Sequence, residues 1–424
     1  MTVTATGAIS KPQVAETKRI RLTSRVLHIG SAVQKLNPFE YVQTGQFVYL
    51  PDSEVLSREL RKRGFLNDYI YTIEERKPIT QLLKNALGED WETAKGEDGQ
   101  AIFPRSLRSL KWAQGTITDL RPMIRDGFGR PYIPGSSIKG AMRTAIAYHL
   151  LKNADRYRVA KDNRASAIEK QLRSSMGDLK RKARFTDDSL FMDELFSNFG
   201  LSFQEREVKA RQGPNTDFMR AIQVSDSQPL VERRVQREGK RPVFFNLPVA
   251  TETLVSSRWP DYKAKYRASI YAEMLFNVNA QFEVSIDREM LSWFSHNNGM
   301  KLPFHTVDEL LAICRDFAQD QWDFEHDYWA EIRTNTDRGQ NLDFSDIKDL
   351  YEPETCPYAL RLGWGSGLRG TTISLLMRDE LVAEVRDTCG LKAPGFEAPK
   401  SRRTVKGPKG EIRFAPGWID FKGV

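Results

Sequence analysis

Cysteine and histidine are scarce in this sequence, whose 424 residues include 3 cysteines and 5 histidines. Cys314, Cys356 and Cys389 are odd in number and widely spaced, so they give neither a disulfide framework nor a CxxC zinc half-site. The histidines show no HExxH or comparable metal-binding spacing. No uninterrupted apolar run approaches the roughly 18 residues of a membrane-spanning helix. These absences argue against a disulfide-rich secreted protein, a zinc protein and a membrane protein, and they favour a reducing cytoplasm.

The amino terminus also lacks a targeting signal. Residues 1–17 are small and polar without the apolar stretch of a signal peptide, so we expect a flexible tail there. The remaining composition, with 40% hydrophobic and 28% charged residues overall, is that of a folded globular protein. No internal repeat of about 20–50 residues is evident, which argues against a solenoid.

Positive charge is modest in total but uneven along the chain. There are 64 Lys and Arg against 56 Asp and Glu, a formal net charge of +8. Residues 151–185 contain eleven basic and four acidic side chains, and residues 400–424 contain seven and two. Such runs form either solvated helix faces or phosphate-binding surfaces, and charge alone does not choose between them.

Hydrophobic periodicity predicts an α+β fold. The order of strong elements is strand, helix, strand, strand, helix, strand, which is typical of a ferredoxin-like or RRM-type unit. Pro134 and Gly135 interrupt regular structure, and Ser136 or Ser137 is then a candidate cap for the first helix. The expected elements are strands at 17–30, 115–120, 217–225, 266–286, 357–364 and 417–421, and helices from the serine cap to about 151, at 306–332 and at 371–385.

The first glycine-rich segment, residues 133–143, has features of a phosphate site. Ser136, Lys139 and Arg143 are three and four residues apart, so they share one face of a helix. A helix start with free N–H groups, a hydroxyl and two cations suits a phosphate. The spacing is not that of a Walker A loop, because the lysine precedes the second glycine. An ordinary capped helix with a solvated basic face explains the segment as well.

The second glycine-rich segment is residues 363–372. Gly365, Gly367 and Gly370 formally match the GxGxxG dinucleotide fingerprint. No second βαβ strand ending in an acidic residue follows, so a nicotinamide or flavin enzyme is only a distant alternative. The loop either approaches a phosphate chain, with Trp364 to stack and Arg369 to pair, or is a structural turn. No set of residues forms a recognisable catalytic constellation.

Four segments resemble motifs of a known family. They are LHIGS at 27–31, YIPGSSIKGAMRTAI at 132–146, DFMRAIQVSDS at 217–227 and LRLGWGSGLRGTT at 360–372. With these segments in this order, the chain resembles the RAMP superfamily of CRISPR-associated proteins, which are built from RRM/ferredoxin-like domains. Within that superfamily it is most similar to the subunit of the type III-A (Csm) effector that caps the 3′ side of the guide RNA.

The resemblance implies a particular domain organisation. An RRM/ferredoxin-like RAMP core would span residues 18–290, with large, mainly helical insertions at about 37–111 and 151–209. A C-terminal helical and strand part, residues 291–424, would pack on this core and carry the Gly-rich loop 363–370.

The resemblance also implies a non-catalytic RNA-binding role in antiviral defence. The subunit would bind guide RNA, contact the adjacent backbone subunit and other Csm subunits, and assist guide maturation by admitting host trimming nucleases. No cofactor, metal or membrane is implied. The residues that would contact RNA are His28, Ser136, Ser137, Lys139, Gly140, Arg143, Arg220, Gly363, Trp364, Gly365, Gly367, Arg369 and Gly370.

The loop after the first strand bears on catalysis. Target-cleaving relatives place a catalytic Asp there, whereas residues 30–38 (GSAVQKLNP) contain no acid. We therefore expect no nuclease activity. The alternative is a metal-dependent RNA endonuclease of the same superfamily.

Overall fold

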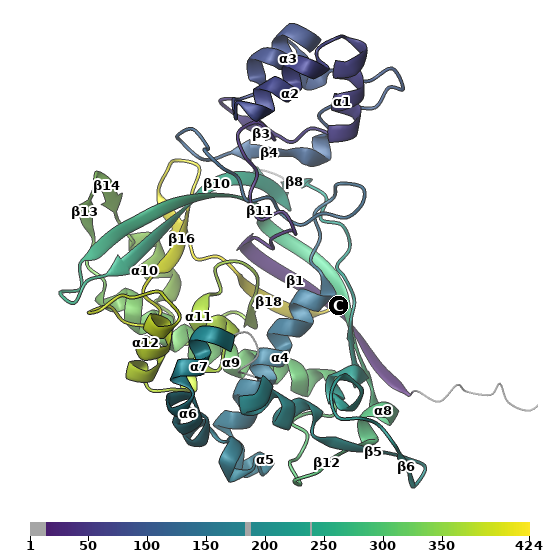
Figure 1. Cartoon of the computed structure of the whole chain (residues 1–424), viewed down its shortest axis with the longest axis vertical. Helices are drawn as coiled ribbons and strands as arrows, with labels where there is room; N and C mark the ends of the chain where they lie inside the picture. Colours follow the sequence, from purple (N-terminus) through teal and green to yellow (C-terminus); the bar gives the residue numbers. More distant parts are fainter. Residues whose placement is uncertain (1–13, 183–187, 238–239) are drawn as a thin grey trace, which may run out of the picture.

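The computed structural model describes residues 14–182, 188–237 and 240–424 and is built around one large mixed sheet (Figure 1). The centre of the sheet consists of β1 (Ala15–Leu27), β10 (Leu247–Arg258), β11 (Ala264–Asp287) and β18 (Trp418–Gly423). These strands lie in the order β18-β1-β11-β10, and each neighbouring pair is antiparallel. Helix α4 (Gly135–Lys152) follows β1, and α9 (Val307–Glu331) follows β11. The predicted ferredoxin-like α+β core is confirmed.

A two-residue alternation along β1 separates the core from the solvent. Ile20 and Leu22 are fully buried, whereas Arg19, Arg21 and Arg25 are exposed, as expected for a strand covered on one face. The buried face packs into a single apolar core with β11, α4 and α9. Members of that core include Phe282, Val284, Ile138, Met142, Leu310 and Phe317.

The ends of two predicted elements can be compared directly. Strand β1 begins at Ala15, so the end of the expected tail belongs to the sheet, while residues 1–13 lie outside the described residues. The helix predicted at 306–332 is confirmed. Thr306 caps α9 by accepting a hydrogen bond from the backbone N–H of Glu309, whose carboxylate accepts one in return from the backbone N–H of Thr306.

The predicted second strand of the core is wrong. Residues 217–225 form a 3₁₀ turn, η7 (Phe218–Ala221), and then the three-residue strand β7 (Ile222–Val224) at the far end of β11. Asp217 starts the turn by accepting a hydrogen bond of 2.9 Å from the backbone N–H of Met219. The central strand is β10 instead, which the sequence prediction missed.

The insertion expected at 37–111 forms a lobe at one end of the molecule (Figure 1). Its helices enclose a separate apolar cluster that includes Leu56, Leu60, Leu83 and Trp91. The lobe also contains strands that were not predicted, and the last of them pairs in parallel with β10. Its elements are β2 (Val42–Gln43), β3 (Phe47–Tyr49), α1 (Ser53–Lys62), α2 (Leu66–Glu74), α3 (Thr80–Leu87) and β4 (Arg108–Lys111).

The second insertion, expected at 151–209, is helical in its first part and ends in a small sheet. That sheet also takes β12 (Phe294–His296) from beyond the core strands. The elements of the insertion are α5 (Ala154–Tyr157), α6 (Ala165–Ser174), α7 (Met176–Lys182), the π-helix η5 (Asp188–Ser197), β5 (Phe199–Phe203) and β6 (Arg206–Val208).

The C-terminal part contributes strands to the core sheet. Strand β18 pairs with β1 on one side and β15 on the other. The continuous helix predicted at 371–385 is wrong, because the extended residue Thr372 ends α11 (Gly367–Thr371). The next α-helix, α12 (Asp379–Thr388), begins at Asp379. The elements are β13 (Asn335–Asp337), β14 (Gln340–Leu342), α10 (Ser345–Tyr351), β15 (Leu360–Arg361), α11 (Gly367–Thr371), α12 (Asp379–Thr388), β16 (Arg402–Lys406) and β17 (Ile412–Phe414).

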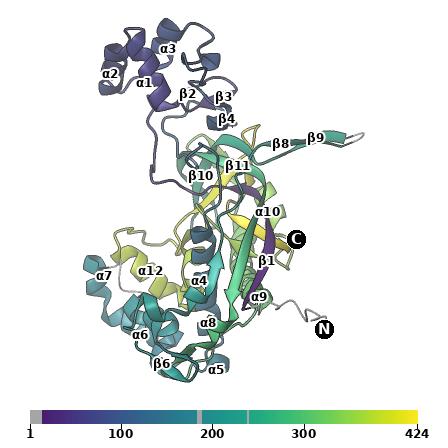
Figure 2. The ribbon, with the colours of Figure 1, turned by 90° about the vertical axis from the view of Figure 1, so that its right-hand side faces the viewer.

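A two-stranded arm extends from the body of the molecule (Figure 2). It consists of β8 (Arg233–Arg237) and β9 (Lys240–Phe245), which pair with each other in a sheet of their own. Within the described ranges, no helix combines the length and the apolar character that crossing a bilayer requires.

Candidate nucleic-acid interface

The start of α4 already holds a carboxylate of the protein itself. The backbone N–H of Gly135 donates a hydrogen bond of 2.7 Å to Oδ1 of Asp226. A Cβ at Gly135 would lie 2.2 Å from the carbonyl oxygen of Val224, so only glycine allows this close approach. Ser136 is exposed and Ser137 half-buried, but neither side chain caps the helix, so the predicted serine cap is wrong.

The two cations of α4 are directed toward neighbouring segments of the chain. Lys139 Nζ donates to the carbonyl oxygen of Ile222 at 2.7 Å, and partial burial lowers the pKa of Lys139. Arg143 Nη1 lies 2.6 Å from Oδ2 of Asp217, and its guanidinium lies 3.9 Å from the ring centroid of Phe196. Both cations thus have partners within the protein, so the alternative of a solvated basic face does not describe α4.

Two other residues were expected to contact RNA, Gly140 of α4 and Arg220 of η7. Gly140 is exposed, and a Cβ there would meet none of the described residues within 4 Å. Arg220 is exposed on the 3₁₀ turn and donates 2.7 Å to the carbonyl oxygen of Asn215. Contact of these two residues with RNA stays a prediction.

The glycine turn packs directly against the end of β1. Gly363 has a φ of +76°, and a Cβ there would lie 2.4 Å from the carbonyl oxygen of His28. That oxygen also accepts a hydrogen bond of 2.9 Å from the backbone N–H of Trp364. Gly365 is buried against Pro416, and Gly367 is exposed at the start of α11. The structure thus brings residues 28 and 363–367 together, a contact that the sequence did not predict.

His28 supports the turn from below. Its Nδ1 lies 2.7 Å from the carbonyl oxygen of Glu273, and burial lowers the pKa of the imidazole. The His28 ring meets the Trp364 ring edge-on, with centroids 5.5 Å apart. A buried neutral imidazole in this position orients the indole but is not itself on the surface.

Arg369 is inside the protein and does not face a ligand. Its side chain is 5% exposed and pairs with Asp379. It also donates to the carbonyl oxygens of Ser374 and Ala398. Gly370 is likewise buried, with Gln321 3.0 Å from the position of a Cβ. The expectation that Arg369 pairs with a phosphate is corrected.

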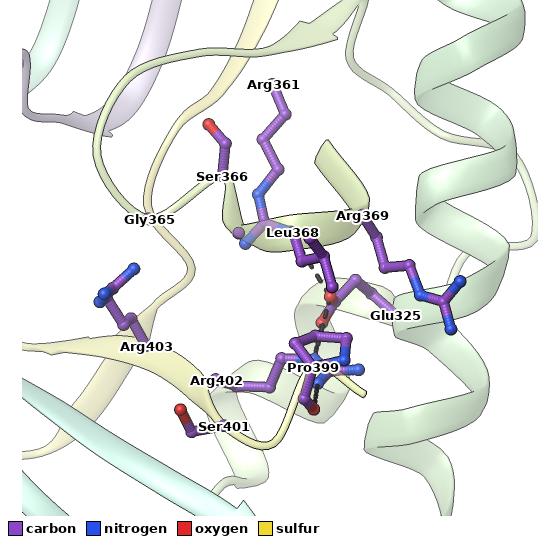
Figure 3. Close-up of a pocket in the computed structure, with 11 residues that line it drawn as sticks. Glu325, Arg361, Gly365, Ser366, Leu368, Arg369, Pro399, Ser401, Arg402 and Arg403 are labelled. Carbon is purple, nitrogen blue, oxygen red and sulfur yellow. Dashed lines mark hydrogen bonds and ion pairs between the residues drawn. The ribbon is translucent and has the colours of Figure 1, made fainter. Parts of the chain in front are cut away.

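A buried ionic network lies beneath the turn (Figure 3). Glu325 accepts from Arg402 at 3.0 Å and from Arg361 at 3.5 Å, so one carboxylate serves two guanidinium groups. A small cavity of about 30 Å³ separates this network from the backbone of the turn. Because the partners come from residues 325, 361 and 402, sequence spacing gave no signal for them.

The sequence model of the RAMP superfamily matches residues 19–333 of this chain. The chain belongs to the RAMP superfamily.

Curated relatives of this RAMP protein carry the description "CRISPR system Cms protein Csm5". The Streptococcus thermophilus protein is 28% identical over 129 residues, 30% of this chain and 36% of its own length. The Mycobacterium tuberculosis (strain CDC 1551 / Oshkosh) protein is 26% identical over 238 residues, 50% of this chain and 56% of its own length. The matches thus span between about a third and just over half of these relatives.

Two solved structures share the RAMP fold along most of the chain. One is a chain of a cryo-EM structure described as a Csm–crRNA–target RNA ternary complex of a type III-A CRISPR-Cas system. Its TM-score is 0.60 at 25% identity, covering 96% of this chain and 100% of that one. The other is the crystal structure of T. onnurineus Csm5, with a TM-score of 0.51, 19% identity, and coverage of 95% and 100%. The resemblance to a Csm subunit inferred from the sequence is confirmed.

The β8–β9 arm of this RAMP protein is the basic feature that the sequence reading missed. Residues 233–245 (RRVQREGKRPVFF) contain five basic side chains and one acidic one. Arg233, Arg234 and Arg241 are exposed, and the guanidinium of Arg234 lies 5.9 Å from the ring centroid of Phe244. The Glu-Gly pair in the sequence, between two short segments that contain Val, Phe and Arg, was the available signal for two paired strands. Among the described residues, no group of three or more His, Cys, Asp or Glu is arranged to hold a metal ion.

Proposed function

We propose that this chain is an RNA-binding subunit of a type III-A CRISPR effector and binds the 3′ side of the guide RNA. The observation that carries the proposal is the structural similarity, over 96% of this chain, to a chain of the Csm–crRNA–target RNA complex. The adjacent backbone subunit and other Csm subunits are the proposed protein partners.

The chemistry of the surface supports a nucleic-acid partner. Phosphate contacts from Lys and Arg supply most of the affinity of such proteins and make it salt-dependent. The exposed arginines lie on the β8–β9 arm, whose two strands extend away from the body of the molecule (Figure 2). An RNA strand can therefore approach the arm from either side. The arm is thus suited to an extended polyanion.

The proposed role is non-catalytic. Residues 30–38, where target-cleaving relatives carry an Asp, contain no acidic side chain. Maturation of the guide 3′ end would then depend on trimming nucleases that the assembled complex admits.

The test combines RNA binding with reconstitution. Guide-like RNA is titrated against the parent chain and the triple variant Arg233→Ala, Arg234→Ala, Arg241→Ala. Each lost phosphate contact should reduce the salt slope by about 0.7 for a single strand. Lys84→Ala is the control, because the side chain of Lys84 in the helical lobe is 37% exposed and paired with Glu89 at 2.6 Å.

Two outcomes contradict the proposal. One is guide binding by the parent chain that does not change with salt. The other is cleavage of RNA by the purified chain that depends on a divalent metal, which would favour the alternative of a metal-dependent RNA endonuclease.

A further inference from the structure

Two arginines from distant parts of the sequence meet at Trp364. The guanidinium carbon of Arg121 lies 5.8 Å from the centroid of the Trp364 ring, and that of Arg403 lies 4.9 Å from it. Arg121 bridges to Ala272 of β11, Arg403 belongs to β16, and Trp364 belongs to the glycine turn. Three segments of the fold thus place two cations and one indole in the same small area.

Neither arginine has a carboxylate partner. Among the residues that the structure describes, no Asp or Glu oxygen lies within 4.0 Å of either guanidinium. Arg121 Nη1 makes a long contact of 3.4 Å to the carbonyl oxygen of Gln34. The Nε atoms of both arginines are inaccessible and without a hydrogen-bond partner among these residues.

The nearby acids are already used by other arginines. Glu273 is bound by Arg125 Nη2 at 2.5 Å, and Glu325 is shared between Arg361 and Arg402. Burial lowers the pKa of Arg403, and the charges of Arg121 and Arg361 lower it further. The area around Trp364 therefore carries uncompensated positive charge.

This arrangement is unfavourable without an anion and favourable with one. Two like charges that are half-buried repel each other more strongly than they would in water. A phosphate bound by these guanidinium groups offsets that repulsion with charge-assisted hydrogen bonds, for which the guanidinium fork is well shaped. The indole holds both guanidinium groups through cation–π contacts and keeps them in place before the anion arrives.

We propose that Arg121 and Arg403, positioned by Trp364, bind a phosphate of an RNA strand that passes the glycine turn. The inference rests on the proposed function, because it specifies which group of the RNA is bound and by which residues. It differs from the site expected at α4, where Asp226 and Asp217 already occupy the helix start and Arg143.

The test uses charge removal at each arginine separately. Arg121→Gln and Arg403→Gln should each weaken guide-like RNA binding about tenfold, the effect of about 1.4 kcal/mol. Each should also reduce the salt slope by up to about 0.7. The control is Arg288→Ala, because Arg288 is 54% exposed and paired with Glu16 at the other end of the sheet. Thermal unfolding of every variant checks that the fold is retained. Because the two arginines are tested separately, one variant still tests the inference if the other variant does not fold.

The RNA probes distinguish two sources of the phosphate. Guide-like strands are prepared with a 3′-phosphate and with a 3′-hydroxyl. An equal loss of affinity for both strands assigns a phosphodiester within the strand, and a loss confined to the 3′-phosphorylated strand assigns a terminal phosphate. If the folded variants bind RNA with the same affinity and salt slope as the parent chain, the inference is overturned and the proposed function still stands. A parent chain that binds neither strand contradicts the proposed function and this inference together.

Discussion

The carboxylate of Asp226 accepts a hydrogen bond of 2.7 Å from the backbone N–H of Gly135 and so occupies the start of α4. Asp226 lies 91 residues further along the chain. A carboxylate at this position satisfies one of the unpaired N–H groups of the helix and is favoured by the helix dipole. The helix start within residues 133–143, which the sequence indicates as a possible phosphate site, is thus occupied by a carboxylate of the protein.

The first prediction concerns this contact. Asp226→Ala should lower the free energy of unfolding by about 1 kcal/mol, the usual contribution of a helix-capping side chain. Urea unfolding measures the effect. Asp349→Ala is the control, because Asp349 is an exposed acid within α10. Equal stability of the two variants would show that the contact contributes nothing.

The second prediction concerns the pair formed by Arg143 and Asp217. Their side chains are 28% and 17% exposed. Arg143→Ala should destabilise the protein by roughly 1–3 kcal/mol, because it leaves a mostly buried acid without its partner. The effect on guide affinity should be small. A double-mutant cycle with Asp217→Ala isolates the pair, and an independent sum of the two effects would argue against it.

The third prediction compares two glycines. Gly363→Ala should destabilise the protein by more than about 1 kcal/mol, because the backbone is left-handed there and the Cβ would strike the carbonyl oxygen of His28. Gly140→Ala lies within α4, and its Cβ would meet no described atom within 4 Å. It should stabilise the helix by about 0.5–1 kcal/mol. Shifts of the same sign in thermal unfolding would contradict this account.

The fourth prediction is a pH dependence that arises from His28. Burial lowers its pKa in the folded state below the ordinary 6.5, so the unfolded chain binds the proton first. Stability contributed by the neutral imidazole is present above pH 6.5 and is lost as the pH falls toward the folded pKa. The slope for one such group reaches about 1.4 kcal/mol per pH unit. Urea unfolding between pH 8 and pH 5 measures it.

The control for this pH series is His28→Gln, which keeps a donor for the carbonyl oxygen of Glu273 and removes the titration. Its stability should depend less on pH than that of the parent. Some dependence should remain, because burial also lowers the pKa of His149. Identical curves for parent and variant would rule out His28 as a source.

Local patterns in the sequence predicted the parts of the fold that depend on near neighbours. The alternation of β1 and the helical period of α9 are confirmed because both signals lie within the element itself. Residues 217–225 are also rich in apolar side chains, yet Asp217 caps a turn there and β7 is only three residues long. Apolar content thus did not distinguish a central strand from a short edge segment.

The candidate site shows the same limit. The resemblance listed His28 and the glycine turn as separate RNA contacts, and their packing against each other is seen only in the structure. Helical spacing correctly put Lys139 and Arg143 one turn apart, but their partners lie 83 and 74 residues away. Arg121 and Arg403 meet only because β11, β16 and the turn converge, so no spacing rule could have found them.

The length of β11 has a mechanical consequence. Its 24 residues, at about 3.3 Å each, give a continuous strand on the order of 80 Å along its contour. One end lies beside β13 and β14, and the other joins α8 (Arg288–Ser292). Between them, β1 and β10 hydrogen-bond to it along almost its whole length. The two ends of the core sheet are therefore joined by one hydrogen-bonded strand, with no loop between them.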